Sequence, residues 1–343
     1  MVIDANMYWM PEELFHNAKL LQQFLDAVPQ DTAVYQADIP GTMKKQIIVE
    51  KPKGFQNLNY GESQYELETQ LKEMDEAGVQ QSILKLPGCQ EWLTLDLCKV
   101  FNDGLASQVG KSNGRLHALA TIPPVATSEV LEELDRCVHQ LGFVGVQLSS
   151  HYGESYLDDP KFRPLLKHIH DLQVPVYVHH TPLPVQYDSL LDYDNLRRSY
   201  GRCADQITAV TRELFSGLFE ELPNLKIVHS MLGGGFFTYY HLMLPKRPSR
   251  KETLGRFVVE TEDAYRYLAN NIYFEMSHAA PWGKEQLECA IRVFGASQVI
   301  FGSSYPVRRD WLLDGPSFIQ DLEISEEDKN MVLGKNAQRV YGL

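Results

Sequence analysis

Short apolar runs rich in β-branched residues alternate along the chain with segments whose apolar residues recur at helical spacing. This order is typical of successive β–α units around a parallel sheet. The strands predicted in this way are residues 1–5, 81–86, 116–121, 144–148, 174–178, 225–228, 272–276 and 298–301. Because eight strands are what a closed (β/α)8 barrel requires, we predict an α/β fold, a TIM barrel that forms one domain over residues 1–343.

Amphipathic segments lie between the predicted strands. In residues 65–77, for example, Leu67, Leu71 and Met74 recur at helical spacing. A last helix is expected to begin at Ser325, since a serine followed by acidic residues suits a helix N-terminus. The predicted helices are residues 65–77, 130–141, 161–172, 205–222, 283–294 and 325–333.

Two connections are longer than ordinary β–α loops, so we predict insertions after the first and fifth strands. Residues 10–60 contain several prolines and a basic stretch, and we interpret them as a cap over the C-terminal mouth of the barrel, where active sites of this fold lie. Residues 182–202 contain Tyr187, Tyr193, Arg197 and Arg198. Either insertion could equally be a contact between subunits, and the sequence leaves both interpretations open.

The charge balance argues against two classes of partner. There are 45 acidic and 32 basic residues, which give a formal net charge of −13. Such a chain is repelled by nucleic acids and by anionic membrane surfaces. The five cysteines are scattered without a Cys-x-x-Cys pair, and no basic leader with a long apolar stretch occurs at the start. We therefore expect a cytoplasmic protein with neither a nucleic-acid nor a membrane partner.

Several segments resemble one known family. Residues 115–123 read Arg-Leu-His-Ala-Leu-Ala-Thr-Ile-Pro, and residues 142–148 read Gly-Phe-Val-Gly-Val-Gln-Leu. Tyr-Leu-Asp-Asp-Pro-Lys-Phe at 156–162 precedes Val-Pro-Val-Tyr-Val-His at 174–179. In this order the segments resemble the amidohydrolase-related decarboxylases, which include aminocarboxymuconate semialdehyde decarboxylase and resorcylate decarboxylase. The resemblance implies a barrel that holds a divalent metal and acts on aromatic or unsaturated carboxylic acids.

The family's metal ligands come from four strand ends, three of which carry other residues here. Asn6 and Tyr8 stand where the family has histidine or glutamate on its first strand, whereas His179 matches its fifth-strand histidine. Met231 and Ser304 stand in the places of the sixth-strand histidine and the eighth-strand aspartate. Amide, phenol and thioether groups are poor ligands for zinc or manganese. We therefore expect no cofactor and a degenerate metal site, with zinc or manganese as the alternative.

A displaced metal site is the form that this alternative would take. Residues two apart in a strand face the same side, so His229 is expected to point into the barrel with Met231. His179, His229 and Glu275 could then converge on a metal ion. The other interpretation is a core histidine at position 229, hydrogen-bonded to Asn6 or Tyr8.

The remaining candidates concern proton transfer and substrate binding. A neutral imidazole can act as acid or base, and a phenol can donate a hydrogen bond to an oxyanion. We therefore predict His179, Tyr8 and His229 as catalytic residues. The predicted substrate-binding residues are Asn6, His151, Glu275, His278, Ser304 and Arg308.

These candidates favour an enzyme over a non-catalytic binding protein, although a binding pocket also needs polar groups. We expect a metal-independent carboxy-lyase-like or hydrolase-like enzyme that acts by acid–base chemistry on a small aromatic or unsaturated carboxylic acid. A metal-dependent hydrolase or decarboxylase with relocated ligands, and a ligand-binding pseudoenzyme, are the alternatives. Whether the chain forms a homodimer cannot be read from the sequence.

Overall fold

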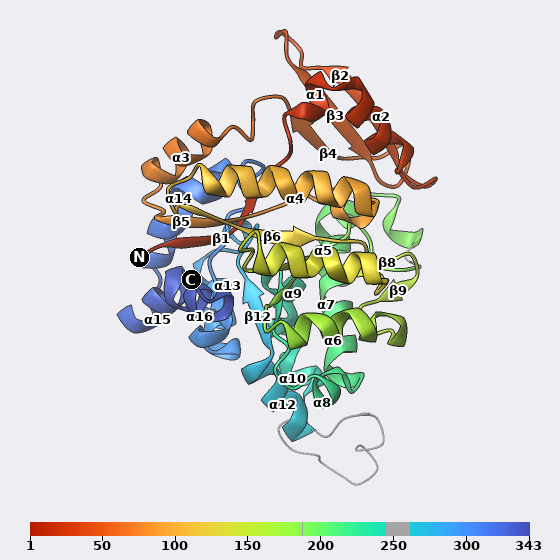
Figure 1. Ribbon diagram of the computed structural model, residues 1–343. Coiled ribbons are helices and arrows are strands. Elements are labelled where there is room, and N and C mark those ends of the chain that lie inside the picture. Colours follow the sequence, from red (N-terminus) through yellow and green to blue (C-terminus); the bar gives the residue numbers. More distant parts are fainter. Residues whose placement is uncertain (187, 245–260) are drawn as a thin grey trace.

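An eight-stranded parallel sheet forms the centre of the computed structural model, which describes residues 1–186, 188–244 and 261–343 (Figure 1). The strands follow one another around the sheet in chain order. They are β1 Ile3–Tyr8, β5 Gln81–Lys85, β6 Leu116–Thr121, β7 Gly145–Ser149, β10 Val176–His179, β11 Ile227–His229, β12 Ile272–Glu275 and β13 Val299–Ile300. Each corresponds to a predicted strand, so the predicted barrel is confirmed.

The first and last strands come together and nearly close the barrel. The amide of Ala5 donates to the carbonyl of Phe301 at 3.0 Å, and that of Tyr8 donates to the carbonyl of Tyr305 at 2.8 Å. Met7 and Tyr305 form a parallel bridge. This closure places the end of β1 beside the residues that follow β13.

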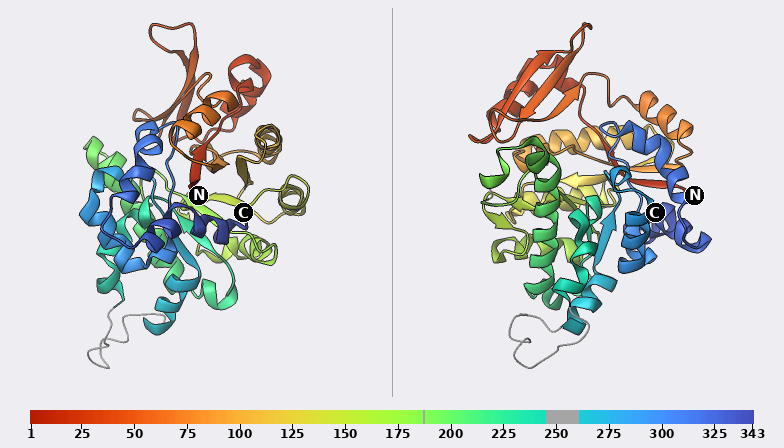
Figure 2. Two further views of the ribbon diagram at one scale, coloured as in Figure 1. Left: turned by 90° about the vertical axis from the view of Figure 1, so that its left-hand side faces the viewer. Right: turned by 180° about the vertical axis from the view of Figure 1, so that it is seen from behind.

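Helices surround the barrel, and most of the predicted ones are present (Figures 1 and 2). The segment 205–222 is divided in two, because Gly217 adopts a φ of 77°, which ends α7 and starts α8. The main helices are α3 Leu67–Glu76, α4 Leu95–Gly110, α5 Ser128–His139, α6 Arg163–Asp171, α7 Gly201–Phe215, α8 Leu218–Glu221, α9 Met231–Gly235, α10 Tyr240–Met243, α12 Thr261–Asn270, α13 Lys284–Phe294, α14 Arg309–Gln320, α15 Glu326–Asn330 and α16 Asn336–Tyr341. No helix in the described ranges is long and apolar enough to cross a membrane.

The insertion after β1 folds into its own small layer. It holds α1 Glu13–His16, α2 Ala18–Asp26 and an antiparallel sheet of β2 Ala33–Asp38, β3 Lys45–Glu50 and β4 Gln56–Gly61. In both views the sheet projects from the barrel body (Figure 2). We call residues 10–61 the cap segment.

The insertion after β10 touches the cap segment. It contains the short helices η3 Asp188–Leu190 and η4 Asn195–Tyr200, the second of which runs into α7, while Tyr187 lies outside the described residues. The guanidinium of Arg197 lies 4.1 Å from the ring centre of Phe55. Arg198 donates to the carbonyl of Asn57 at 3.3 Å. The two long insertions therefore meet beside the barrel.

Candidate active site

Strand register decides which side chains point into the barrel. Paired residues of parallel neighbours face the same side, and Val178, His229 and Phe274 are paired with one another across β10, β11 and β12. Tyr177 precedes Val178 and Glu275 follows Phe274, so both point to the opposite side from this row. They meet inside the barrel, where the phenol of Tyr177 donates to the carboxylate of Glu275 at 2.8 Å. The row that contains His229 consequently faces outward.

His229 is therefore not part of the site, and the prediction that it points into the barrel is wrong. Its Nδ1 lies 2.9 Å from Gln206 Oε1 and its Nε2 lies 2.7 Å from Glu213 Oε2, both on α7. The prediction assumed that side chains still alternate between His229 and Met231. It failed because β11 ends at His229 and Met231, with a φ of 55°, is no longer in extended conformation. The interpretation as a core histidine holds, with partners other than Asn6 and Tyr8.

Asn6 is the centre of a buried polar network inside the barrel. A register shift in β1 between Asp4 and Met7 lets its side chain point inward. Asn6 Nδ2 lies 2.9 Å from the Tyr177 hydroxyl, 3.0 Å from Glu275 Oε2 and 3.1 Å from Ser304 Oγ. The structure thus brings together three of the predicted site residues, namely Asn6, Glu275 and Ser304.

Tyr8 and His179 form a hydrogen-bonded pair above this network. His179 Nδ1 lies 2.8 Å from the carbonyl oxygen of His180, which can only accept, so Nδ1 carries the proton. Nε2 is then an acceptor, and the Tyr8 hydroxyl donates to it at 3.1 Å. Two of the three predicted catalytic residues, Tyr8 and His179, are therefore in contact, and the backbone sets the tautomer of His179.

Burial keeps the histidines of the site neutral. It lowers the pKa of His179 well below its usual value, and the nearby Lys85 lowers it further. His180 stacks on His179 with ring centres 4.4 Å apart, and its pKa is also lowered by burial. Burial and Arg202 lower the pKa of His278 to about 3. These rings therefore accept hydrogen bonds or protons rather than supply a positive charge at rest.

Lys85, at the end of β5, is a site residue that the sequence analysis missed. Its side chain is fully buried, and its Nζ has no hydrogen-bond partner among the described residues. Nζ lies 4.1 Å from the ring centre of Tyr8 and 4.4 Å from that of Tyr177. Burial lowers the pKa of this amine well below its usual value, against the attraction of Glu275. Ile83 points into the barrel two residues earlier, so strand alternation could have revealed the inward direction of Lys85.

Glu275 is expected to make the stability depend on pH. Burial raises its pKa from 4.5 to about 7, although Lys85 and the hydrogen bonds of Tyr177 and Asn6 oppose the shift. The folded state then holds a proton between these two pH values that the unfolded state has released. The contribution of Glu275 to the free energy of unfolding therefore falls as pH rises from 4.5 to about 7, by up to about 3 kcal/mol.

Urea denaturation of the wild type and of Glu275→Gln tests this expectation. The variant should gain stability relative to the wild type between pH 4.5 and pH 8. Glu285→Gln, on the surface of α13, is the control and should show a constant difference. A constant difference for Glu275→Gln as well would contradict the raised pKa.

A pocket lies above the Tyr8–His179 pair, between the barrel and the cap segment. It is a narrow pocket that opens to solvent. Barrel and loop residues form one wall and the cap segment forms the other. Its lining includes Tyr8, His179, His180, Arg202 and His278 from the barrel side, with Lys51, Asn57 and Tyr60 from the cap segment.

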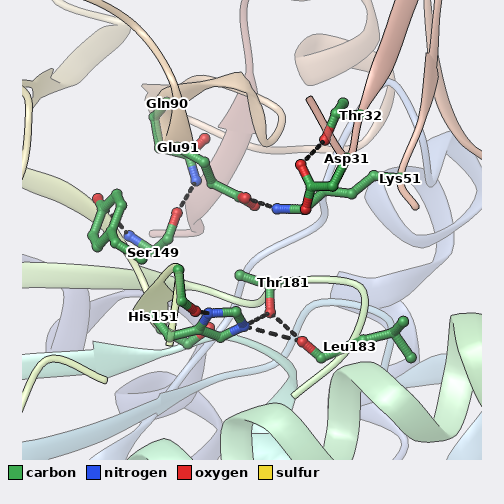
Figure 3. A network of polar contacts seen from close by, with 12 residues as sticks. Asp31, Thr32, Lys51, Gln90, Glu91, Ser149, His151, Thr181 and Leu183 are labelled. Carbon is green, nitrogen blue, oxygen red and sulfur yellow. Dashed lines mark hydrogen bonds and ion pairs between the residues drawn. The ribbon is translucent and has the colours of Figure 1, made fainter. Parts of the chain in front are cut away.

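A buried ion pair fastens the cap segment to the barrel beside this pocket (Figure 3). Lys51 pairs with Glu91, which follows β5, and both side chains are largely buried. Burial lowers the pKa of Lys51 to about 8. Next to Glu91, the amide of Gln90 donates to Ser149 Oγ at 2.9 Å. The pocket wall is thus held by polar contacts as well as by packing.

Two predicted substrate-binding residues have other partners. Both ring nitrogens of His151 face backbone carbonyls, of Gly153 at 2.9 Å and of Leu183 at 3.0 Å, so this ring holds its loop together (Figure 3). Arg308 pairs with Asp310 at 2.6 Å and lines a second pocket rather than the first. His278, by contrast, lines both pockets.

Comparison with known proteins identifies the family. Residues 90–343 match the family model described as Amidohydrolase, and the chain belongs to this family. It is 28% identical over 249 residues to 2-amino-3-carboxymuconate-6-semialdehyde decarboxylase of Dictyostelium discoideum, covering 73% of this chain and 67% of the relative. It is 27% identical over 303 residues to gamma-resorcylate decarboxylase of Rhizobium sp. (strain MTP-10005), covering 80% and 87%.

A solved structure with a similar fold corrects the cofactor expectation. The 5-carboxyvanillate decarboxylase of Novosphingobium aromaticivorans is 20% identical, superimposes with a TM-score of 0.78 and covers 100% of this chain and 96% of its own. It was solved in complex with manganese and 4-hydroxy-3-methoxy-5-nitrobenzoic acid. The expectation of no cofactor is therefore contradicted, since the comparison points to a divalent metal.

The donors in this chain do not fit a metal site of the usual kind. Within the described ranges no three His, Cys, Asp or Glu side chains lie close enough together to hold a metal ion. His179 and Glu275 supply one imidazole and one carboxylate, whereas zinc sites use three or four strong ligands. Among the described residues, Asn6 Oδ1 and Glu275 Oε1 have no hydrogen-bond partner, and the side-chain amine near Glu275 is that of Lys85.

Proposed function

We propose that the chain is a decarboxylase that acts on small hydroxylated aromatic carboxylic acids. The observation that carries the proposal is the Tyr8–His179 pair at the base of a pocket at the strand ends. The resemblance to carboxymuconate semialdehyde and resorcylate decarboxylases supports the same reaction class.

The pair can move one proton out of the substrate and back into it. A substrate hydroxyl that donates to the oxygen of Tyr8 allows the Tyr8 proton to pass to His179 Nε2, which has the free lone pair. The ring of the substrate becomes a phenolate, and electron density rises at the carbon that bears the carboxylate. A hydroxyl ortho or para to the carboxylate meets this need.

The return of the proton completes the reaction. The lowered pKa of His179 makes its protonated form a stronger acid than an ordinary imidazolium. It returns the proton through Tyr8 to the carbon that bears the carboxylate, the bond to the carboxyl carbon breaks, and its electron pair restores the aromatic ring. Carbon dioxide leaves, and the phenolate product takes a proton from water. The buried pocket favours this release because a carboxylate loses its charge on leaving.

Turnover in heavy water tests the proposal. The full chain is incubated with 2,6-dihydroxybenzoate and with 4-hydroxyisophthalate, each with and without added manganese. We expect one deuterium at the carbon that carried the carboxylate and one equivalent of carbon dioxide, measured by NMR and mass spectrometry. Tyr8→Phe should abolish both signals. Binding of these acids without release of carbon dioxide under either condition would contradict the proposal and favour a binding protein.

A further inference from the structure

Arg202 lies where two pockets meet. It lines the pocket above Tyr8 and His179, and it also lines a second, more open pocket. We call these the inner and the outer pocket. The wall of the outer pocket also includes Arg198, Arg308 and Trp282. A ligand that reaches from one pocket to the other would pass the guanidinium of Arg202.

Among the residues that the structure describes, the guanidinium of Arg202 has no carboxylate partner within 4.0 Å. Its Nη2 donates to Asn57 Oδ1 of the cap segment at 2.9 Å, and its buried Nε has no hydrogen-bond partner among the described residues. Across the outer pocket, Arg308 is neutralised by Asp310. Other arginines of the described chain likewise have carboxylate partners within 4.0 Å, among them Arg115, Arg136, Arg163, Arg212 and Arg309.

The surroundings of Arg202 leave its charge uncompensated. Burial lowers its pKa to about 10, and the adjacent Arg198 lowers it further, so the guanidinium stays charged at neutral pH. The neighbouring rings of His179, His180 and His278 carry no negative charge. Arg202 is partly buried, and a cation that is withdrawn from water without a counterion costs free energy unless an anion pairs with it. The planar guanidinium is suited to a carboxylate, which it can bind through two parallel hydrogen bonds.

We infer that Arg202 binds a carboxylate that stays on the substrate, so that the substrate is an aromatic dicarboxylic acid. The inference rests on the proposed function. The carboxylate that leaves becomes neutral carbon dioxide, so a fixed cation on it would stabilise the ground state more than the transition state. The neutral Tyr8–His179 pair suits the reacting end in the inner pocket. Arg202 suits the second carboxylate, towards the outer pocket.

Binding of unreactive acids to the full chain tests this assignment by calorimetry. The probes are isophthalate and 3-carbamoylbenzoate, which have similar shapes and differ by one charge. We expect the wild type to bind isophthalate at least about tenfold more tightly. Arg202→Met should reduce this ratio to near one, and Arg202→Lys should keep part of it. Arg266→Met, which removes a surface arginine paired with Asp263, is the matched control and should keep the full ratio.

Two results would overturn the inference: a wild-type ratio near one, or a tenfold ratio that persists in Arg202→Met. Circular dichroism and thermal melts verify that each variant is folded, and Arg202→Lys gives a second comparison if the methionine variant is not. The turnover experiment under the proposed function tests the decarboxylase proposal separately from this inference. If the affinity ratio depends on Arg202 but no turnover occurs, the decarboxylase proposal is wrong and the anion site stands. If turnover occurs but the wild-type affinity ratio is near one, the anion site is wrong and the decarboxylase proposal stands.

Discussion

Replacement of His179 by glutamine is expected to lower kcat for decarboxylation by a factor of about 10²–10⁴, the usual contribution of a positioned acid–base group. Glutamine can still accept a hydrogen bond from Tyr8, so the packing of the network should change little. It cannot take up and return a proton near neutral pH. The loss should therefore appear in kcat more than in KM, and the free energy of unfolding should stay close to that of the wild type.

A double-mutant comparison separates catalysis from packing. If Tyr8 and His179 act as one proton relay, the double variant Tyr8→Phe/His179→Gln should be about as slow as the slower single variant. Losses that multiply would show that the two residues act independently. His139→Gln, an exposed histidine at the end of α5, is the control and should leave kcat unchanged.

The barrel could be predicted because it depends on periodicities that are local in the sequence. Every predicted strand coincides with an observed one, since a buried parallel strand reads as a short apolar run between helical segments. The resemblance indicated the places of Asn6, Tyr8 and His179 at strand ends, but the register shift that turns Asn6 inward was not visible in the sequence. The direction of His229 did not, because alternation has no meaning past the last residue of a strand.

The charged side chains around the pocket could not be predicted from the local pattern of apolar and polar residues. Arg202 lies on the first turn of α7, far from the strand ends in sequence, and reaches the pocket only because the two insertions meet. The link from Lys51 to Glu91 also depends on how the cap segment folds over the barrel. Contacts of this kind depend on tertiary packing, which single-sequence patterns do not contain.

The residues that take the place of the family's metal ligands also show what the sequence does not reveal. The resemblance implies which strand ends matter, and the substitutions at Asn6, Tyr8 and Ser304 are visible in the sequence. What replaces the ligands is not visible. The structure places the amine of Lys85 among these residues, against the rings of Tyr8 and Tyr177. A buried amine without a hydrogen-bond partner weakens a fold, and such groups are commonly kept where they serve function.

Replacement of Lys85 by methionine should therefore raise stability and lower activity together. Methionine has nearly the same length and keeps favourable contacts with both tyrosine rings, while the desolvated amine is removed. We expect the free energy of unfolding to rise by about 1–2 kcal/mol. We also expect kcat to fall by about 10²-fold, because the N–H donors of this amine, which lies against the Tyr8 ring, no longer stabilise the phenolate that forms on the substrate.

The matched control is Lys329→Met, since Lys329 is also buried but pairs with Glu326 at 2.7 Å. That variant should lose stability and keep its activity. Urea denaturation and steady-state kinetics on the same preparations measure both quantities. A Lys85→Met variant that is less stable and fully active would show that the amine is a structural group. A more stable and inactive variant would show that the chain sacrifices stability to keep a buried amine where proton transfer takes place, which is the expected signature of an active-site residue.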